Sequence, residues 1–108
     1  MFEVIFTELY NEQVRKLLSP QFQRDIYVRI QKLREHPYSG KPLGAVHFRE
    51  MKLQKFRVFY FVYPDERIVL VMAVSDKKHQ QETIALIRKN SETFRHFIEK
   101  YIKSEERG

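Results

Sequence analysis

The sequence contains no cysteine, and its 108 residues include only three glycines and four prolines. Without cysteine the protein can form no disulfide, no thiolate nucleophile and no cysteine-based zinc site. A glycine-rich phosphate loop is also absent, which argues against a bound nucleotide cofactor. No G-x-S-x-G motif surrounds any serine, so a serine nucleophile of that type is not indicated.

Metal-binding patterns are missing as well. His36, His47 and His96 are scattered along the chain without the spacing of metal ligands. Neither an H-E-x-x-H motif nor a paired acidic motif occurs. We therefore expect a protein that uses neither a metal ion nor an organic cofactor.

The sequence lacks a recognisable targeting signal. Its first residues, MFEVIFTELYNE, carry acidic side chains where a secretory signal needs cations, and their apolar run is too short. No stretch approaches the roughly 20 apolar residues of a membrane-spanning helix. These absences favour a cytoplasmic protein. The length is typical of one domain, which we place at residues 1–108, with residues 104–108 expected to fray.

Positive charge is what the chain has in excess. Lysine and arginine number 20 against 14 acidic residues, which gives a formal charge of +6. Such an excess favours an anionic partner: a nucleic acid, an acidic protein or a membrane surface. A basic soluble protein without such a partner has the same composition, so charge alone leaves both possibilities open.

Two apolar runs in the second half of the chain predict a β-hairpin. Phe56–Tyr63 and Ile68–Val74 are rich in β-branched and aromatic residues and flank the turn signal Pro64-Asp65-Glu66. Ala45–Leu53 precedes them as a third strand. Because Ile68–Val74 contains no polar residue, we expect it to lie centrally in the sheet, with both faces covered.

The first half of the chain predicts a strand followed by a helical hairpin. Phe2–Thr7 has the length and composition of a strand, and apolar residues recur at helical spacing over Glu8–Leu18. Ser19-Pro20 combines a favoured N-cap with a favoured first helical residue, so a second helix is expected to begin there and to end before Pro37. The segment His36–Gly44 is expected to be an extended loop.

A long helix is predicted from about Gln80 to Lys103. From Phe94 on, it either packs on the sheet or projects beyond the sheet to contact a partner. The expected order is therefore β-α-α-β-β-β-α. This is an α+β fold, in which a small, mainly antiparallel sheet packs against a helical hairpin and is joined by a long C-terminal helix.

Five segments carry a family resemblance: Leu43-Gly44, Phe48–Leu53, Phe56–Val62, Arg67–Leu70 and Lys77–Gln80. In their order, lengths and basic positions they resemble the RelE/ParE superfamily of type II toxins, and most closely its phage-derived, HigB-like branch. The resemblance extends over almost the whole chain. It implies the fold described above.

The resemblance also implies a small cytoplasmic toxin, neutralised by an antitoxin that is a helix-turn-helix protein from the adjacent gene. Many relatives are metal-independent, ribosome-dependent endoribonucleases, and for these the partners are mRNA and the ribosome, with no part for a membrane. Another branch inhibits DNA gyrase and cleaves nothing. An inactive relative that only binds its antitoxin is a third possibility, and likeness of fold does not decide among the three.

Metal-free RNA cleavage needs a base for the 2′-hydroxyl, an acid for the departing 5′-oxygen and cations at the phosphate. Arg57 and Lys52 stand at basic positions of the family, although Arg57 could also be a strand-end side chain that reaches solvent. Glu50 replaces a lysine of the best-known ribonucleases, and is either the general base or a surface partner of Lys52. His79 is our candidate for the general acid, or else an exposed loop histidine.

Further cations are expected to contact RNA phosphates: Arg49, Lys55, Lys77 and Lys78. The last two also suit a solvated basic turn. Between residues 41 and 63 the cations greatly outnumber the single anion, as on a surface that follows a phosphate backbone. We expect the catalytic candidates to meet in one pocket shaped for a phosphodiester.

Overall fold

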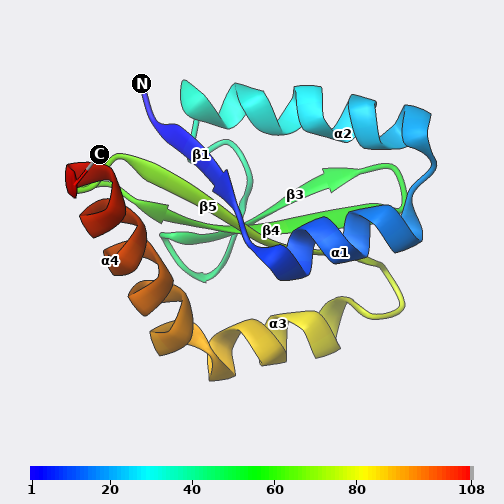
Figure 1. Cartoon of the computed structure of the whole chain (residues 1–108). Coiled ribbons are helices and arrows are strands. Elements are labelled where there is room, and N and C mark those ends of the chain that lie inside the picture. Colours follow the sequence, from blue (N-terminus) through cyan, green and yellow to red (C-terminus); the bar gives the residue numbers. More distant parts are fainter. Residues whose placement is uncertain (108) are drawn as a thin grey trace.

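Five strands form one sheet, and helices cover both of its faces (Figure 1). The computed structural model describes residues 1–107, apart from the side chain of Arg107. The strands lie in the order β1-β5-β4-β3-β2, and every neighbouring pair is antiparallel except β1 with β5. Their bounds are β1 Glu3–Phe6, β2 Lys41–Ala45, β3 Phe48–Leu53, β4 Phe56–Tyr63 and β5 Ile68–Asp76.

The helices are divided between the two faces of the sheet. In Figure 1, α1 and α2 lie over one face, and α3 and α4 lie over the other. None of the helices within residues 1–107 combines the length and the apolar character that a membrane span requires. Their bounds are α1 Glu8–Leu17, α2 Pro20–Gln31, the 3₁₀ turn η1 Lys32–Arg34, α3 Gln80–Lys89 and α4 Ser91–Arg107.

Hydroxyl side chains start the first two helices. Thr7 accepts a hydrogen bond from the backbone N–H of Tyr10 and donates one to the carbonyl of Met72 at 2.7 Å, which ties the start of α1 to β5. Ser19 accepts from the N–H of Phe22, and Pro20 occupies the first turn of α2. The predicted helical hairpin and its break at Ser19-Pro20 are thus confirmed.

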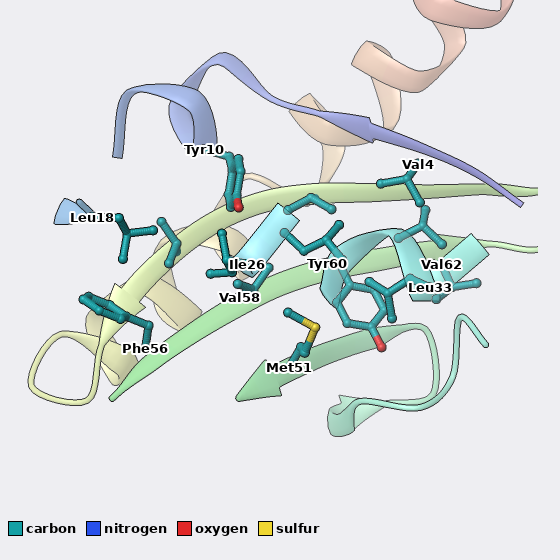
Figure 2. Packing of buried hydrophobic residues seen from close by; sticks show 14 residues of the cluster. Val4, Tyr10, Leu18, Ile26, Leu33, Met51, Phe56, Val58, Tyr60 and Val62 are labelled. Atoms are coloured by element: carbon teal, nitrogen blue, oxygen red, sulfur yellow. The ribbon is translucent and has the colours of Figure 1, made fainter. Parts of the chain in front are cut away.

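Strand β5 is the centre of the sheet, as its apolar sequence predicts. It pairs with β1 on one side and with β4 on the other, and the residues from Val69 to Val74 have no exposed surface. Two apolar clusters enclose it. Figure 2 shows the cluster on the side of α1 and α2, which includes Tyr10, Ile26 and Tyr60. The other cluster fills the space between the sheet and α3 and α4. The α+β class is confirmed.

The expected loop before the sheet contains a strand. β2 pairs with β3 through Lys41 with Glu50 and Pro42 with Arg49. A turn follows β2, so the single strand expected over Ala45–Leu53 is interrupted. The composition of β2 hid it, because proline and glycine are tolerated mainly at a sheet edge, which is where β2 lies.

The long C-terminal helix is broken at Asn90. The Asn90 side chain and backbone N–H both donate to carbonyls of the last turn of α3, and α4 begins with the next residue. Helix α4 then packs on the sheet, since Ile98 is fully buried and Arg95 pairs with Glu66 at 2.8 Å. It remains helical to Arg107 where fraying was expected, and Gly108 lies outside the described residues.

Candidate functional site

A cavity of about 680 Å³ opens beside the end of β3. Strand β2 pairs with β3 no further than Glu50, so within residues 1–107 the segment Met51–Leu53 has no strand on that side. The cavity occupies this free edge, and its walls come from the end of α2, η1, the loop after η1, the first residue of β2, β3, β4 and the first residue of α3. Among the described residues its charged lining is five cations and one carboxylate: Arg29, Lys32, Lys41, Lys52, Arg57 and Glu50.

The pleat of the sheet brings three of these side chains together. Lys52 lies directly opposite Arg57 in the β3–β4 register, and Glu50 is the diagonal neighbour of Arg57 because it pairs with Phe59. Residues two apart on a strand share a face, so all three side chains project from the same side of the sheet. Local strand geometry is therefore sufficient to assemble this part of the site.

Glu50 and Arg57 form a buried ion pair. Arg57 Nε lies 3.7 Å from Glu50 Oε1, and the side chains are only 10% and 6% exposed, respectively. Gln80, the first residue of α3, donates its side-chain N–H to the same oxygen of Glu50. Two elements, β4 and α3, thus fix the carboxylate from the side of Oε1.

One nitrogen of the Arg57 guanidinium has no hydrogen-bond partner. Nη1 is buried, and among the residues that the structure describes it is the sole buried side-chain nitrogen or oxygen atom without one. An unpaired buried N–H is costly, more so on a charged group, so such groups are rare in folded proteins. An anion in the adjoining cavity would supply the missing acceptor, and guanidinium geometry suits two oxygens of a phosphate.

Gly40 lets the loop before β2 lie directly on β3. A Cβ atom there would come within 2.6 Å of both the carbonyl oxygen of Glu50 and the hydroxyl of Tyr60. The Gly40 N–H donates to the Tyr60 hydroxyl at 3.0 Å. Burial raises the pKa of the Tyr60 phenol above its ordinary value, so the hydroxyl stays neutral as it accepts. This contact sets the position of one cavity wall.

Arg49, which the sequence suggested as a phosphate contact, holds that same wall. Its side chain is buried, and it donates to the carbonyls of Gly40 at 2.9 Å and Val46 at 2.7 Å. Its guanidinium also lies over the ring of Tyr38, 5.4 Å from the ring centre. The alternation of the strand turns Arg49 to the face opposite Glu50, and Arg49 is not among the described residues that line the cavity.

The other predicted phosphate contacts lie apart from the cavity. Lys55 is in the turn between β3 and β4, with its ammonium 5.4 Å from the centre of the Phe56 ring. Lys77 and Lys78 are exposed in the turn between β5 and α3. None of the three contributes to the described lining of the cavity.

His79 lies outside this group too. It lines a separate cavity of about 590 Å³ between α1 and α3, together with Gln13 and Leu86. Its Nδ1 is 2.8 Å from Asp76 Oδ1, and this contact holds the pKa of the Asp76 carboxyl below its usual range. The structure therefore brings together Glu50, Lys52 and Arg57, three of the four predicted catalytic residues, and turns the fourth elsewhere.

Sequence reasoning missed five polar residues of the cavity: Arg29, Lys32, Ser39, Lys41 and Gln80. Arg29 and Lys32 are three apart, which places them on one side of the helical end of α2. That spacing was visible, but only the packing of α2 on the sheet places them near Arg57. Within residues 1–107, no group of three or more His, Asp or Glu side chains is arranged to hold a metal ion.

Comparison with known families gives one family match. The family model described as the ParE toxin of the type II toxin-antitoxin system parDE matches residues 4–81. This span contains Glu50, Lys52, Arg57 and Gln80. No curated protein matches the sequence.

Several solved structures resemble the fold. An E. coli RelE toxin double mutant in the free state has a TM-score of 0.67 at 21% identity, over 81% of this chain and 96% of that one. The intact E. coli RelBE toxin-antitoxin complex has a TM-score of 0.62 at 20% identity, over 70% and 96%. The RelBE2 toxin-antitoxin complex from Mycobacterium tuberculosis has a TM-score of 0.61 at 20% identity, over 70% and 98%. At these low sequence identities, the similarity shows that the fold is shared and nothing more.

Proposed function

The chain belongs to the ParE toxin family of type II toxin-antitoxin systems, within the RelE/ParE superfamily, and from that premise we propose that it is an endoribonuclease that cleaves mRNA on the ribosome. One observation carries the proposal. A buried guanidinium with an unpaired N–H lies beside a fixed carboxylate in a cavity lined by cations. That combination suits a phosphodiester next to a group that can accept a proton.

In the proposed reaction Glu50 accepts the proton of a ribose 2′-hydroxyl. The 2′-oxygen attacks the adjacent phosphorus, and a pentacovalent phosphate forms. The bond from phosphorus to the 5′-oxygen then breaks, which leaves a 2′,3′-cyclic phosphate on one fragment and a 5′-hydroxyl on the other. Glu50 is suited to the first step because Gln80 and Arg57 both approach Oε1, so Oε2 is the oxygen left for the proton.

Arg57 and Lys52 serve the phosphate in this scheme. The guanidinium would bind two non-bridging oxygens and stabilise the charge that builds up on them. Lys52 would give a proton to the departing 5′-oxygen. The sequence pointed to His79 for that role, and we propose Lys52 in its place because Lys52 lines the cavity and His79 lines another one.

The proposal also assigns the chain to a branch of the superfamily and names the kind of protein that neutralises it. The order Glu50-Met51-Lys52 has the acidic, apolar, basic pattern of the HigB-like branch, so we assign the chain there. The E. coli RelBE and M. tuberculosis RelBE2 structures are toxin-antitoxin complexes. By analogy we propose an antitoxin from the adjacent gene as the partner, and the cytoplasm, where mRNA is translated, as the place of action.

A non-enzymatic toxin, such as a gyrase inhibitor, is the second candidate. The observation in its favour is the ion pair itself, since a carboxylate that neutralises Arg57 weakens the attraction for phosphate. The two candidates differ in one measurable way: an endoribonuclease shortens mRNA, whereas a gyrase inhibitor causes DNA damage and leaves mRNA intact.

The experiment is cleavage of a defined mRNA in a translating extract, with mapping of the new ends. The proposal requires fragments with a 5′-hydroxyl and a 2′,3′-cyclic phosphate, and their loss when the 2′-hydroxyl at the cleavage site is replaced by hydrogen. Arg57→Ala should abolish cleavage, and Lys77→Ala, outside the cavity, is the matched control. Intact mRNA in cells whose growth the protein arrests would favour the second candidate.

A further inference from the structure

We propose that the cavity contains a second phosphate subsite, formed by Arg29 and Lys32, and that it binds a single RNA strand over at least two successive phosphates. The inference rests on the proposed function because Arg57 is taken as the subsite of the reacting phosphate. It adds the extent of the ligand, which becomes a strand that bends around the free edge of β3.

The placement of the cations supports two subsites. Arg29 and Lys32 belong to the helical layer over one face of the sheet, whereas Arg57 projects from the other face with Phe59. The cavity joins these two regions at the edge that β2 leaves uncovered. A ligand that reaches both regions must pass around Met51, and a flexible single strand can do so more easily than a stiff duplex.

The charges on the helical side are available to a ligand. Over the part of the chain that the structure describes, no carboxylate lies within ion-pair distance of Arg29 or Lys32. Both side chains belong to exposed residues. A single phosphate at Arg57 and Lys52 would leave these two charges unused.

The size of the cavity points to the same conclusion. Its volume of about 680 Å³ lies well within the range of pockets that bury a drug-sized molecule, roughly 300–1,000 Å³. A lone phosphate group fills only a small part of such a space. Met51, which also lines the cavity, adds apolar surface that a ribose or a base can contact.

The test uses an RNA oligonucleotide with 2′-O-methyl groups, which cannot be cleaved by the proposed route. Its affinity is measured by fluorescence anisotropy over a range of salt concentrations. Each phosphate contact with a single strand contributes about 0.7 to the slope of log K against log salt. The variant Arg29→Gln/Lys32→Gln should therefore lose up to about 1.4 in slope, that is, twice the contribution of one contact.

The matched control is Lys77→Gln/Lys78→Gln, which removes the same charge from an exposed turn outside the cavity. It should retain the slope of the unmodified protein. An equal loss of slope in both double variants, or no loss in either, would overturn the second subsite. So would a failure of the unmodified protein to bind the oligonucleotide, or equal affinity for an oligoglutamate peptide of the same charge. Circular dichroism establishes that both variants are folded.

The outcome is separable from that of the proposed function. If the oligonucleotide binds with the expected slopes but no mRNA is cleaved in the extract, the subsite stands and the catalytic assignment fails. If mRNA is cleaved and the Arg29→Gln/Lys32→Gln variant binds and cleaves as the unmodified protein does, the catalytic assignment stands and the subsite is wrong.

Discussion

Arg57 Nε lies 3.7 Å from Glu50 Oε1, and both side chains are almost wholly removed from solvent. Burial of two charges is expensive, and their attraction offsets that expense only while both are present. The pair is therefore a constraint on folding as well as a candidate catalytic device. A substitution at either position acts on stability and on activity together, and the two effects must be measured separately.

The first prediction concerns the stability of the pair. Removal of one partner leaves an uncompensated buried charge, so Arg57→Ala or Glu50→Ala should each lower the free energy of unfolding by about 3 kcal/mol. The double variant should lose clearly less than the sum of the two, because the unpaired charge is then absent. Urea unfolding of the unmodified protein, the two single variants and the double variant gives the coupling free energy between Arg57 and Glu50. If the losses of the two single variants simply added up in the double variant, the two side chains would not interact in solution.

Gln80 provides a second prediction, on the pH dependence of cleavage. Gln80→Glu replaces the hydrogen-bond donor to Glu50 with a second carboxyl, and two like charges at that distance repel each other. The repulsion favours a shared proton between the two carboxyls, so the ascending limb of the pH–rate profile should move to higher pH. Gln80→Leu removes the hydrogen bond without adding charge and serves as the control. An unchanged limb in Gln80→Glu would remove Glu50 from the role of base.

The third prediction separates the two candidate proton donors. Lys52→Ala should reduce the rate of cleavage at least 100-fold, the usual size of a general-acid contribution. His79→Ala should stay within a few-fold of the unmodified protein, because His79 faces Asp76 and a different cavity. Single-turnover rates on ribosome-bound mRNA measure both. The reverse order of effects would restore His79 as the acid and require its side chain to leave Asp76.

Helix α4 gives a prediction about stability at low pH. The hydrogen bond from Arg95 lowers the pKa of Glu66, so the folded state favours the charged carboxylate. The resulting stabilisation is present above the ordinary carboxyl pKa of roughly 4.3 and is lost as the pH falls through the lowered folded-state value. Because the pair is only partly buried, the effect should be small and should weaken in high salt. Arg95→Met should flatten the dependence of stability on pH. Thermal unfolding between about pH 3 and about pH 6, a range that includes the ordinary carboxyl pKa, would detect the difference.

The fold could be predicted where local chemistry and packing agree. An uninterrupted apolar run identified β5 as central, and Ser19-Pro20 identified the break between α1 and α2. Strand β2 escaped because Lys-Pro-Leu-Gly-Ala lacks the alternation of a strand and is ordered by its partner β3. The break at Asn90 escaped because the apolar stripe continues across it from α3 into α4.

The site divides along the same line. Glu50 and Lys52 share a strand face, and a hairpin sets Arg57 beside them, so a prediction from spacing was possible. Arg29 lines the cavity only because α2 packs on the sheet. In the sequence it is far from Glu50, Lys52 and Arg57, so its place in the site could not be predicted. Arg49 shows the opposite error: it is next to Glu50 in the chain, yet the pleat turns it into the wall of the loop, where it binds backbone carbonyls.

Gly40 offers the last prediction, because it links the fold to the cavity. Gly40→Ala would place a methyl group within 2.6 Å of the backbone carbonyl of Glu50 and the hydroxyl of Tyr60, and neither atom belongs to a flexible chain end. The loop must move away from β3, which should lower the free energy of unfolding by about 1–3 kcal/mol, the usual cost of overpacking. The same movement carries Lys41 outward, so affinity for the 2′-O-methyl oligonucleotide should fall as well. Ser39→Ala, one residue earlier on the cavity wall, is the matched control. If Gly40→Ala were destabilised and yet bound the oligonucleotide as well as the control does, the position of this loop would matter for folding alone.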